Sequence, residues 1–183
     1  MELVWILVIL VLVIVFWLIL TYNLLVTARN RVEEAWSDIE VQMKRRYDLI
    51  PNIVNAVKGY AKHEDSVFTK VTQARTAAMG ARTMKEHAQT ENMLSDTLKS
   101  LFAVSEAYPV LQASDNFLQL QHELTDAEDK IQASRRFYNA NVRDFNTRLQ
   151  VFPTNMIAGT FGFTRREFFD APDVILEAPQ VTF

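Results

Sequence analysis

The stretch LVWILVILVLVIVFWLIL, residues 3–20, decides the fold, because it is an unbroken run of 18 apolar side chains. As an α-helix rising about 1.5 Å per residue it spans roughly 27 Å, close to the ~30 Å hydrocarbon core of a bilayer. A cleaved signal peptide would have a basic N-terminal region, a shorter apolar core and a small-residue cleavage site. The sequence around residues 3–20 has none of these features. We therefore predict a retained transmembrane anchor over residues 1–21, which contacts the lipid bilayer through residues 3–20.

Basic residues near the ends of the run predict its orientation. None precedes it, whereas Arg29 and Arg31 follow it closely, with the cluster at residues 44–46 further along. Positive residues favour the cytoplasmic side of a span. The chain is thus predicted to cross once, with its N-terminus outside and the rest in the cytoplasm.

Composition excludes several classes of function. The 183 residues contain no cysteine, which removes disulfides, thiolate metal sites and cysteine nucleophiles. The formal net charge is −3, without the basic excess typical of nucleic-acid binders. We therefore expect no nucleic-acid partner.

Residues 22–152 are predicted to be long helices, because only two glycines and two prolines interrupt them. Apolar residues recur there at steps of three and four, which indicates amphipathic helices. The predicted helices continue the anchor to about Ile50, run from Asp48 and Pro51 to about Gly80, from Met93 to Tyr108, and from Ser114 to Phe152. The expected fold is all-α, a transmembrane helix that continues into an antiparallel four-helix bundle.

The tail, residues 153–183, has a different composition. It contains three of the five prolines and two of the four glycines, and it is rich in phenylalanine. Disordered tails are poor in aromatic residues. We expect an extended tail that packs against the bundle, the bilayer surface or a second subunit through Phe161, Phe163, Phe168, Phe169 and Phe183.

Charged residues within or beside the apolar stripes predict a structural polar core. A buried charge is costly unless it is paired, so these side chains should form ion pairs between helices, with Glu64 paired to Arg46 or Arg135. A polar cavity or docking groove is the alternative interpretation. The predicted set is Arg29, Arg46, Asp48, Glu64, Glu128 and Arg135.

Catalytic motifs are weak in this sequence. His63 and Glu64 resemble the start of a zinc-protease motif, but Val67 stands where its second histidine must be. The paired Glu-x-x-His motifs of carboxylate-bridged metal bundles and a glycine-rich phosphate loop are lacking too. We therefore predict no catalytic residue, no cofactor site and no metal site.

Five motifs, in order along the chain, resemble the LemA family of bacterial membrane-anchored proteins. They are YNLLVTARNRVEEAW, VQMKRRYDLIPNIVNAVKGYAKHE, EAYPVLQAS, SRRFYNANVRDFN and FPTNMIA, within residues 22–169. The resemblance implies long antiparallel helices behind one transmembrane segment in the bacterial inner membrane, and no established enzymatic activity. Some members carry a lipoprotein-type cysteine before YN and would be exported, so an exported bundle is the alternative topology.

These features predict a non-catalytic membrane-anchored scaffold or adaptor. Coiled-coil-like stripes and an aromatic tail favour self-association, so a homo-oligomer is expected, with other membrane proteins as partners. The resemblance implies an envelope or membrane-proteostasis setting. Two alternatives stay open: a membrane-anchored enzyme with a site between bundle helices, and a lipid-organising protein.

Overall fold

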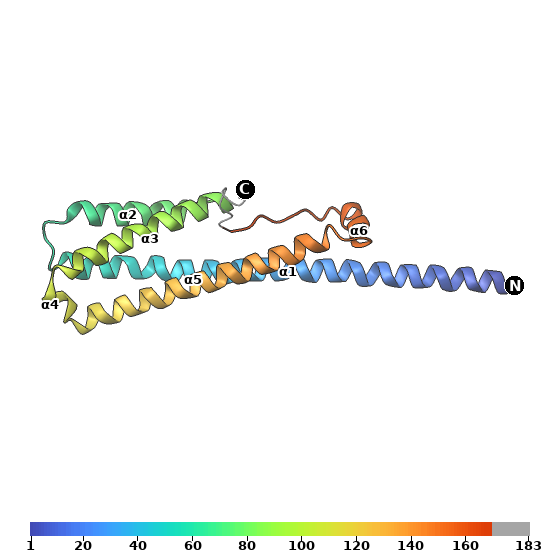
Figure 1. Ribbon diagram of the computed structural model, residues 1–183, viewed down its shortest axis with the longest axis horizontal. Coiled ribbons are helices and arrows are strands. Elements are labelled where there is room, and N and C mark those ends of the chain that lie inside the picture. Colours follow the sequence, from blue (N-terminus) through green and yellow to red (C-terminus); the bar gives the residue numbers. More distant parts are fainter. Residues whose placement is uncertain (170–183) are drawn as a thin grey trace, which may run out of the picture. The chain divides into compact units, whose positions relative to one another are not determined.

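The computed structural model of the protein describes residues 1–169, and most of them are helical. The helices are α1 (Glu2–Lys58), α2 (Asp65–Gly80), α3 (Met84–Glu106), α4 (Pro109–Gln112), α5 (Asp115–Arg148) and α6 (Thr154–Thr160). No strand occurs in residues 1–169. The predicted all-α class is therefore confirmed (Figure 1).

The chain forms two compact units. Unit 1 comprises residues 1–38 and 136–167, and unit 2 comprises residues 39–135 with the segment that begins at Phe168. The boundaries fall inside α1 and α5, so each of these two helices contributes to both units.

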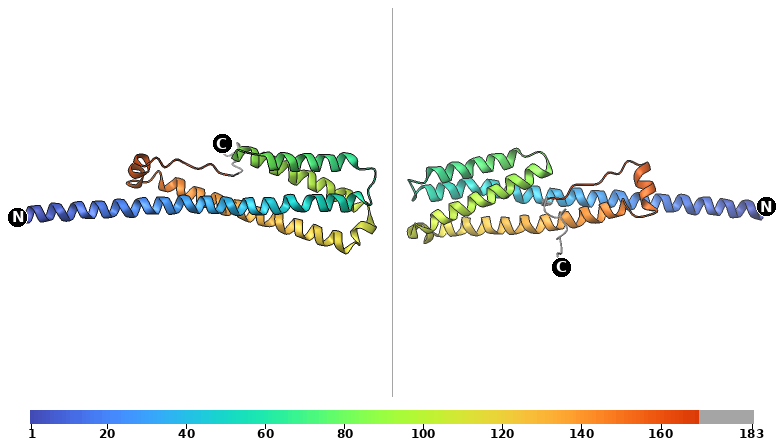
Figure 2. Two further views of the ribbon diagram at one scale, coloured as in Figure 1. Left: turned by 180° about the vertical axis from the view of Figure 1, so that it is seen from behind. Right: turned by 45° about the horizontal axis from the view of Figure 1, so that its top comes forward.

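Unit 2 is a bundle of four helical segments. The C-terminal part of α1, then α2, α3 and the N-terminal part of α5 lie side by side and alternate in direction (Figures 1 and 2). Apolar positions at helical spacing face inward, which is why each segment needs its neighbours. The buried apolar side chains include Ile39, Ile50, Ile53, Val57, Phe68, Val71, Leu94, Leu98, Leu101, Phe117, Leu124 and Ile131.

Pro51 lies inside α1, although the sequence predicted a helix boundary there. Proline has no N–H to bond to the carbonyl four residues earlier, which is that of Tyr47. In the structure, Nε of Arg75 in α2 donates to this carbonyl oxygen at 2.7 Å. The predicted start of a second helix at Asp48 is therefore wrong, because α2 supplies the donor that the proline lacks and α1 continues to Lys58.

The third long helix begins about nine residues earlier than predicted. Thr83 is the N-cap of α3: its side chain accepts from the Glu86 amide, and Glu86 accepts from the Thr83 amide. Such a capping box satisfies amide donors that have no partner within the helix. Most of the stretch predicted to be a polar link is thus the first part of α3.

Unit 1 contains the apolar run, which the rest of the described chain leaves uncovered. By length and composition, α1 is the one helix within residues 1–169 that could span a membrane. After the run, Leu25 forms a small core with Ile157 and Ala158 of α6. Leu149 and Phe163 pack against this core. The tail therefore includes a short helix that the sequence did not predict.

After α6, residues 163–168 have no regular secondary structure. The Asn146 side chain of α5 donates to the carbonyl of Arg166 and accepts from its amide, both at 2.9 Å. The hydroxyl of Tyr138 donates to the carbonyl of Glu167 at 2.9 Å. Neutral side chains of α5 thus hold the backbone of the tail.

Candidate functional site: a buried charge cluster in unit 2

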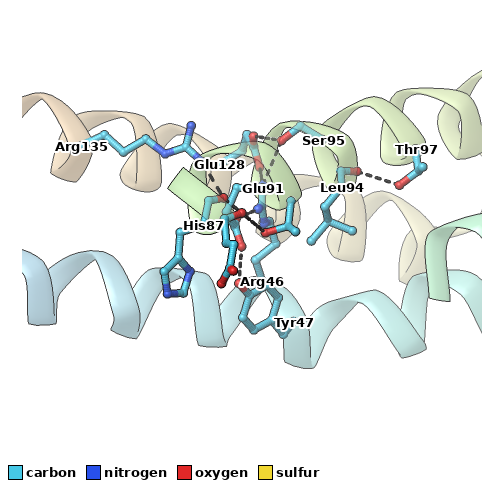
Figure 3. A network of polar contacts seen from close by, with 11 residues as sticks. Arg46, Tyr47, His87, Glu91, Leu94, Ser95, Thr97, Glu128 and Arg135 are labelled. Carbon is cyan, nitrogen blue, oxygen red and sulfur yellow. Dashed lines mark hydrogen bonds and ion pairs between the residues drawn. The ribbon is translucent and has the colours of Figure 1, made fainter. Parts of the chain in front are cut away.

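The candidate site is a cluster of charged side chains inside unit 2. Arg46 comes from α1, Glu91 from α3, and Glu128 and Arg135 from α5. Arg46 and Glu91 are fully buried, whereas the side chain of Glu128 keeps 30% of its surface exposed. Figure 3 shows these side chains pointing toward one another from three helices.

Arg46 is at the centre of the cluster. Its two terminal nitrogens donate to different carboxylates, one to Glu91 and one to Glu128. Ser95 completes the arrangement, since its hydroxyl accepts from Arg46 at 3.1 Å and donates to Glu128 at 2.7 Å. A forked guanidinium is suited to this role, because it presents several fixed donors at once.

Arg135 and Tyr47 complete the surroundings of Glu91. Arg135 lies 4.0 Å from the Glu91 carboxylate, and the hydroxyl of Tyr47 donates to the same carboxylate. Burial raises the pKa of Tyr47, against the nearby arginines, which lower it. The phenol therefore stays protonated and available as a donor at neutral pH.

The aromatic end of the described tail meets the cluster. Phe169 is fully buried, and the Arg135 guanidinium lies 4.4 Å from the centre of its ring. A cation over an aromatic face is attracted by the ring quadrupole. The arginine thus has a carboxylate and an aromatic ring for partners.

His87 lies one helical turn before Glu91 on α3 and borders the cluster (Figure 3). Burial lowers its pKa, and the negative charges of Glu40 and Glu86 oppose this shift. The imidazole is therefore held in its neutral form more strongly than an exposed histidine is.

Three predicted polar-core residues meet in this cluster, namely Arg46, Glu128 and Arg135. Glu64 is not among them: it is the N-cap residue of α2, partly exposed, and its side chain makes no capping hydrogen bond. The expected pairing of Glu64 with Arg46 or Arg135 is replaced by the pairing with Glu91. Glu64 precedes the first turn of α2, because α1 ends at Lys58 instead of before Pro51.

Sequence reasoning missed Glu91, although a signal was present. Glu91 stands three residues after Ala88 and three before Leu94, and all three are buried. That spacing places it on the inner face of a helix. The assignment of residues 80–92 to a polar link concealed it.

The remaining predicted polar residues lie elsewhere. Arg29 belongs to unit 1, where its guanidinium is 5.8 Å from the centre of the Phe163 ring. Asp48 is exposed on α1 and borders an open groove with Lys44, Arg45 and Glu123. Neither residue joins the buried cluster.

The predicted tail contacts are partly visible. Phe161 and Phe163 pack against Tyr22, with ring centroids 4.9 and 5.9 Å apart, and Phe168 is partly exposed. Phe183 lies outside the described residues. Phe161, Phe163 and Phe169 therefore contact helices of their own chain.

The chemistry of the cluster is suited to holding helices together. Two guanidinium groups face two carboxylates, so the formal charges balance, and each carboxylate accepts hydrogen bonds from another helix. Removing one member of a buried pair costs several kcal/mol. Within residues 1–169, no group of three or more histidine, aspartate or glutamate side chains could hold a metal ion.

Fold and site together define a class of protein, a helical bundle with one candidate membrane-spanning helix and a charge-balanced polar core. The LemA family model matches residues 35–183, and the chain belongs to this family. The family membership expected from the sequence motifs is confirmed.

Curated relatives are similar along most of the chain. Magnetosome protein MamQ 2 of Paramagnetospirillum magneticum is 27% identical over 193 aligned residues, which cover 90% of this chain and 71% of the relative. MamQ of Magnetospirillum gryphiswaldense is 25% identical with the same coverage. Protein LemA of Metamycoplasma hominis is 28% identical over 83% of this chain and 70% of its own length.

Proposed function

We propose that this protein is a non-catalytic, membrane-anchored scaffold that self-associates and acts together with other membrane proteins. The observation that supports this best is that the most deeply buried charged side chains form ion pairs between helices. Arg46 and Glu91 are fully buried and join α1 to α3, and Glu128 adds α5. Charged groups that hold three helices together stabilise one packing arrangement, as a scaffold requires.

Two further observations support a role in assembly. The apolar run is completely uncovered by the described chain, so it needs lipid or other spans around it. In unit 2, an open groove beside the exposed Val41 is lined by both acidic and basic side chains. Three relatives are named for the magnetosome, which supports membership in a larger structure.

The scaffold role can be tested by photocrosslinking from Val41 in intact membranes. A photoreactive residue there should yield discrete products of defined mass, whereas the same group at the exposed Thr76 of α2 should yield far fewer. The mass of the detergent-solubilised full chain should correspond to several copies. A monomer without discrete products would contradict the proposal.

The enzyme alternative makes a different prediction for the same material. Carboxylates that served a metal-dependent reaction would retain stoichiometric metal through purification, and Glu128→Gln would release it. In the scaffold, neither the native protein nor Glu128→Gln should retain stoichiometric metal. Metal analysis of both proteins therefore separates the two functions.

We also propose that the span lies in a bacterial inner membrane with unit 2 on the cytoplasmic side, supported by Arg29 and Arg31 after the run. Because the chain has no cysteine, Gln89→Cys on the exposed side of α3 supplies a single reactive thiol. An impermeant thiol reagent should label it only after spheroplasts are lysed. Labelling of intact spheroplasts would support an exported bundle.

A further inference from the structure

The α5–α6 turn, by which we mean residues 149–164 with the short helix α6 included, has an unusual surface for a segment of a water-exposed protein. Residues 149–164, LQVFPTNMIAGTFGFT, contain no charged side chain and no histidine. Phe152 is 78% exposed, Met156 64% and Phe161 59%. Large apolar side chains gathered on one exposed turn are typical of an interaction site.

The structure shows which residues of α1 lie next to this turn. Phe161 packs against Tyr22, two residues after the apolar run ends at Leu20, with ring centroids 4.9 Å apart. Ile157 and Ala158 of α6 form a core with Leu25. In unit 1, α6 therefore lies beside the first turns of α1 that follow the apolar run (Figure 2).

The exposed fractions of the side chains along α1 indicate the same position, next to the end of the apolar run. Side chains in the middle of the run, such as Leu12 at 62% exposed, have only their own helix around them. At the end of the run, Ile19 and Leu20 are still 53% and 52% exposed, and the first buried side chain is that of Thr21, at 8%. The rest of unit 1 therefore begins to cover α1 directly after the apolar run, where a bilayer would have its interface.

We propose that residues 151–161 form a second membrane contact, inserted shallowly into the interface of the leaflet from which α1 emerges. The occupant of this apolar surface is lipid, because the surface continues directly from the end of the span. Interfacial segments bury apolar side chains about 5–10 Å into the headgroup and acyl boundary. Phe152 and Met156 supply those side chains.

The residues that flank the turn fit the same environment. Arg148 precedes the neutral stretch, and Arg165 follows it. Long basic side chains beside an interfacial segment can reach phosphate groups while their stems stay against apolar surface. The side chain of Arg166 points to Glu33 at 2.8 Å, so Arg148 and Arg165 are the flanking cations available to headgroups.

This inference goes beyond the proposed scaffold function and shares only the anchor with it. A single span leaves a helix free to tilt and rotate in the bilayer. A second contact with the interface on one side of α1 would restrict both motions.

Three single-cysteine variants of the full chain test the inference, each carrying the same environment-sensitive fluorophore. Met156→Cys reports the turn, and Val11→Cys reports the span. Phe137→Cys is the matched control, because Phe137 is also a large exposed side chain of unit 1, at 57%, and lies about three turns before the end of α5. The proteins are reconstituted into phosphatidylcholine–phosphatidylglycerol vesicles that contain lipids with shallow or deep nitroxide quenchers.

The label at residue 156 should be quenched by the shallow nitroxide at least about threefold more than the label at 137, and be correspondingly shielded from iodide, as an interfacial position requires. Adding Phe152→Glu should reduce that difference. Strong quenching at residue 11 by the deep nitroxide shows independently that the span is in the bilayer.

Equal iodide access at 156 and 137, with residue 11 still quenched, would overturn the proposal. Shielding at 156 that disappears when the protein is diluted with more lipid would overturn it too, because the surface would then be covered by a second copy of the chain. Shielding that is independent of the protein-to-lipid ratio supports lipid as the occupant.

Discussion

Units 1 and 2 share two helices but are held together by different chemistry. In unit 2 a fully buried arginine joins carboxylates from two other helices. In unit 1, neutral amide and phenol groups hold the tail backbone, and Trp36 packs against Tyr138 with ring centroids 5.7 Å apart. The ion pair between Arg166 and Glu33 in this unit is exposed.

This difference shows how one helix can contribute to two kinds of core. Ion pairs buried between helices require particular partners, because a mismatched charge would be left uncompensated. Aromatic contacts and hydrogen bonds to the backbone depend less on the identity of the partner residue than buried ion pairs do. Unit 2 should therefore be the more sensitive of the two to a single lost charge, and unit 1 to a lost neutral donor.

The largest expected effect follows removal of the most buried carboxylate. Glu91→Ala leaves Arg46 buried with only Glu128 as counter-charge, and should cost about 3–5 kcal/mol of unfolding free energy. Denaturant titration of the detergent-solubilised full chain, followed by far-UV circular dichroism, measures this. Asp96→Ala on the same helix is the control, since its pair with Lys99 is exposed, and it should cost under about 0.5 kcal/mol. Equal losses in the two variants would contradict a charge-dependent unit 2.

Asn146→Ala tests the neutral chemistry of unit 1. It removes two hydrogen bonds to the backbone of Arg166, at about 1 kcal/mol each, so a loss of about 2 kcal/mol is expected. Hydrogen exchange at residues 163–168 should accelerate. Glu33→Gln weakens the exposed ion pair to the side chain of the same Arg166 and should leave that exchange nearly unchanged. If Glu33→Gln released the tail as much as Asn146→Ala, charge would matter in both units.

A double-mutant cycle tests the account of Pro51. Arg75→Ala should cost about 1–2 kcal/mol, because the carbonyl of Tyr47 loses its donor. In a Pro51→Ala background, the alanine N–H can bond to that carbonyl, so the cost of Arg75→Ala should shrink. The coupling between the two changes is the quantity to measure. Strict additivity would show that Arg75 acts independently of the proline.

The smallest expected effect is the loss of stability at mildly acidic pH that His87 causes. The pKa of His87 is lowered by burial below its ordinary 6.5, so the unfolded chain binds a proton more readily than the folded one. Stability from this group is present above about pH 6.5 and is lost as the pH falls through the folded pKa. Melting temperatures measured between pH 7.5 and 5.5 should therefore fall more steeply for the native protein than for His87→Gln. Parallel curves would show that the histidine is exposed.

Most of the fold could be predicted because its signals are local. The apolar run, the scarcity of glycine and proline, and the apolar spacing in residues 115–148 each indicate helix without knowledge of their neighbours. The continuation of α1 through Pro51 could not be predicted, because the donor that accommodates the proline is Arg75, on another helix. Thr83 and Glu86 form a local capping signal that lies within a polar stretch.

The candidate site was predictable only in part for the same reason. Arg46, Glu128 and Arg135 stand in or beside apolar stripes and were expected inside. Their partner depended on the start of α3, and once that helix begins at Met84 the inward position of Glu91 follows from its spacing. An error in one boundary therefore changed the predicted partner of two arginines.

The division of the chain into units has a consequence for the order of events during synthesis. The main part of unit 2 is one continuous segment, residues 39–135, whereas unit 1 joins the first 38 residues to residues 136–167. Contacts between distant parts of a chain must wait until both parts exist. As the chain leaves the ribosome, the charge cluster can form while the first 38 residues still lack their partners. The first two-thirds of α1 must therefore stay helical on their own, or with lipid around them, until the last quarter of the chain arrives.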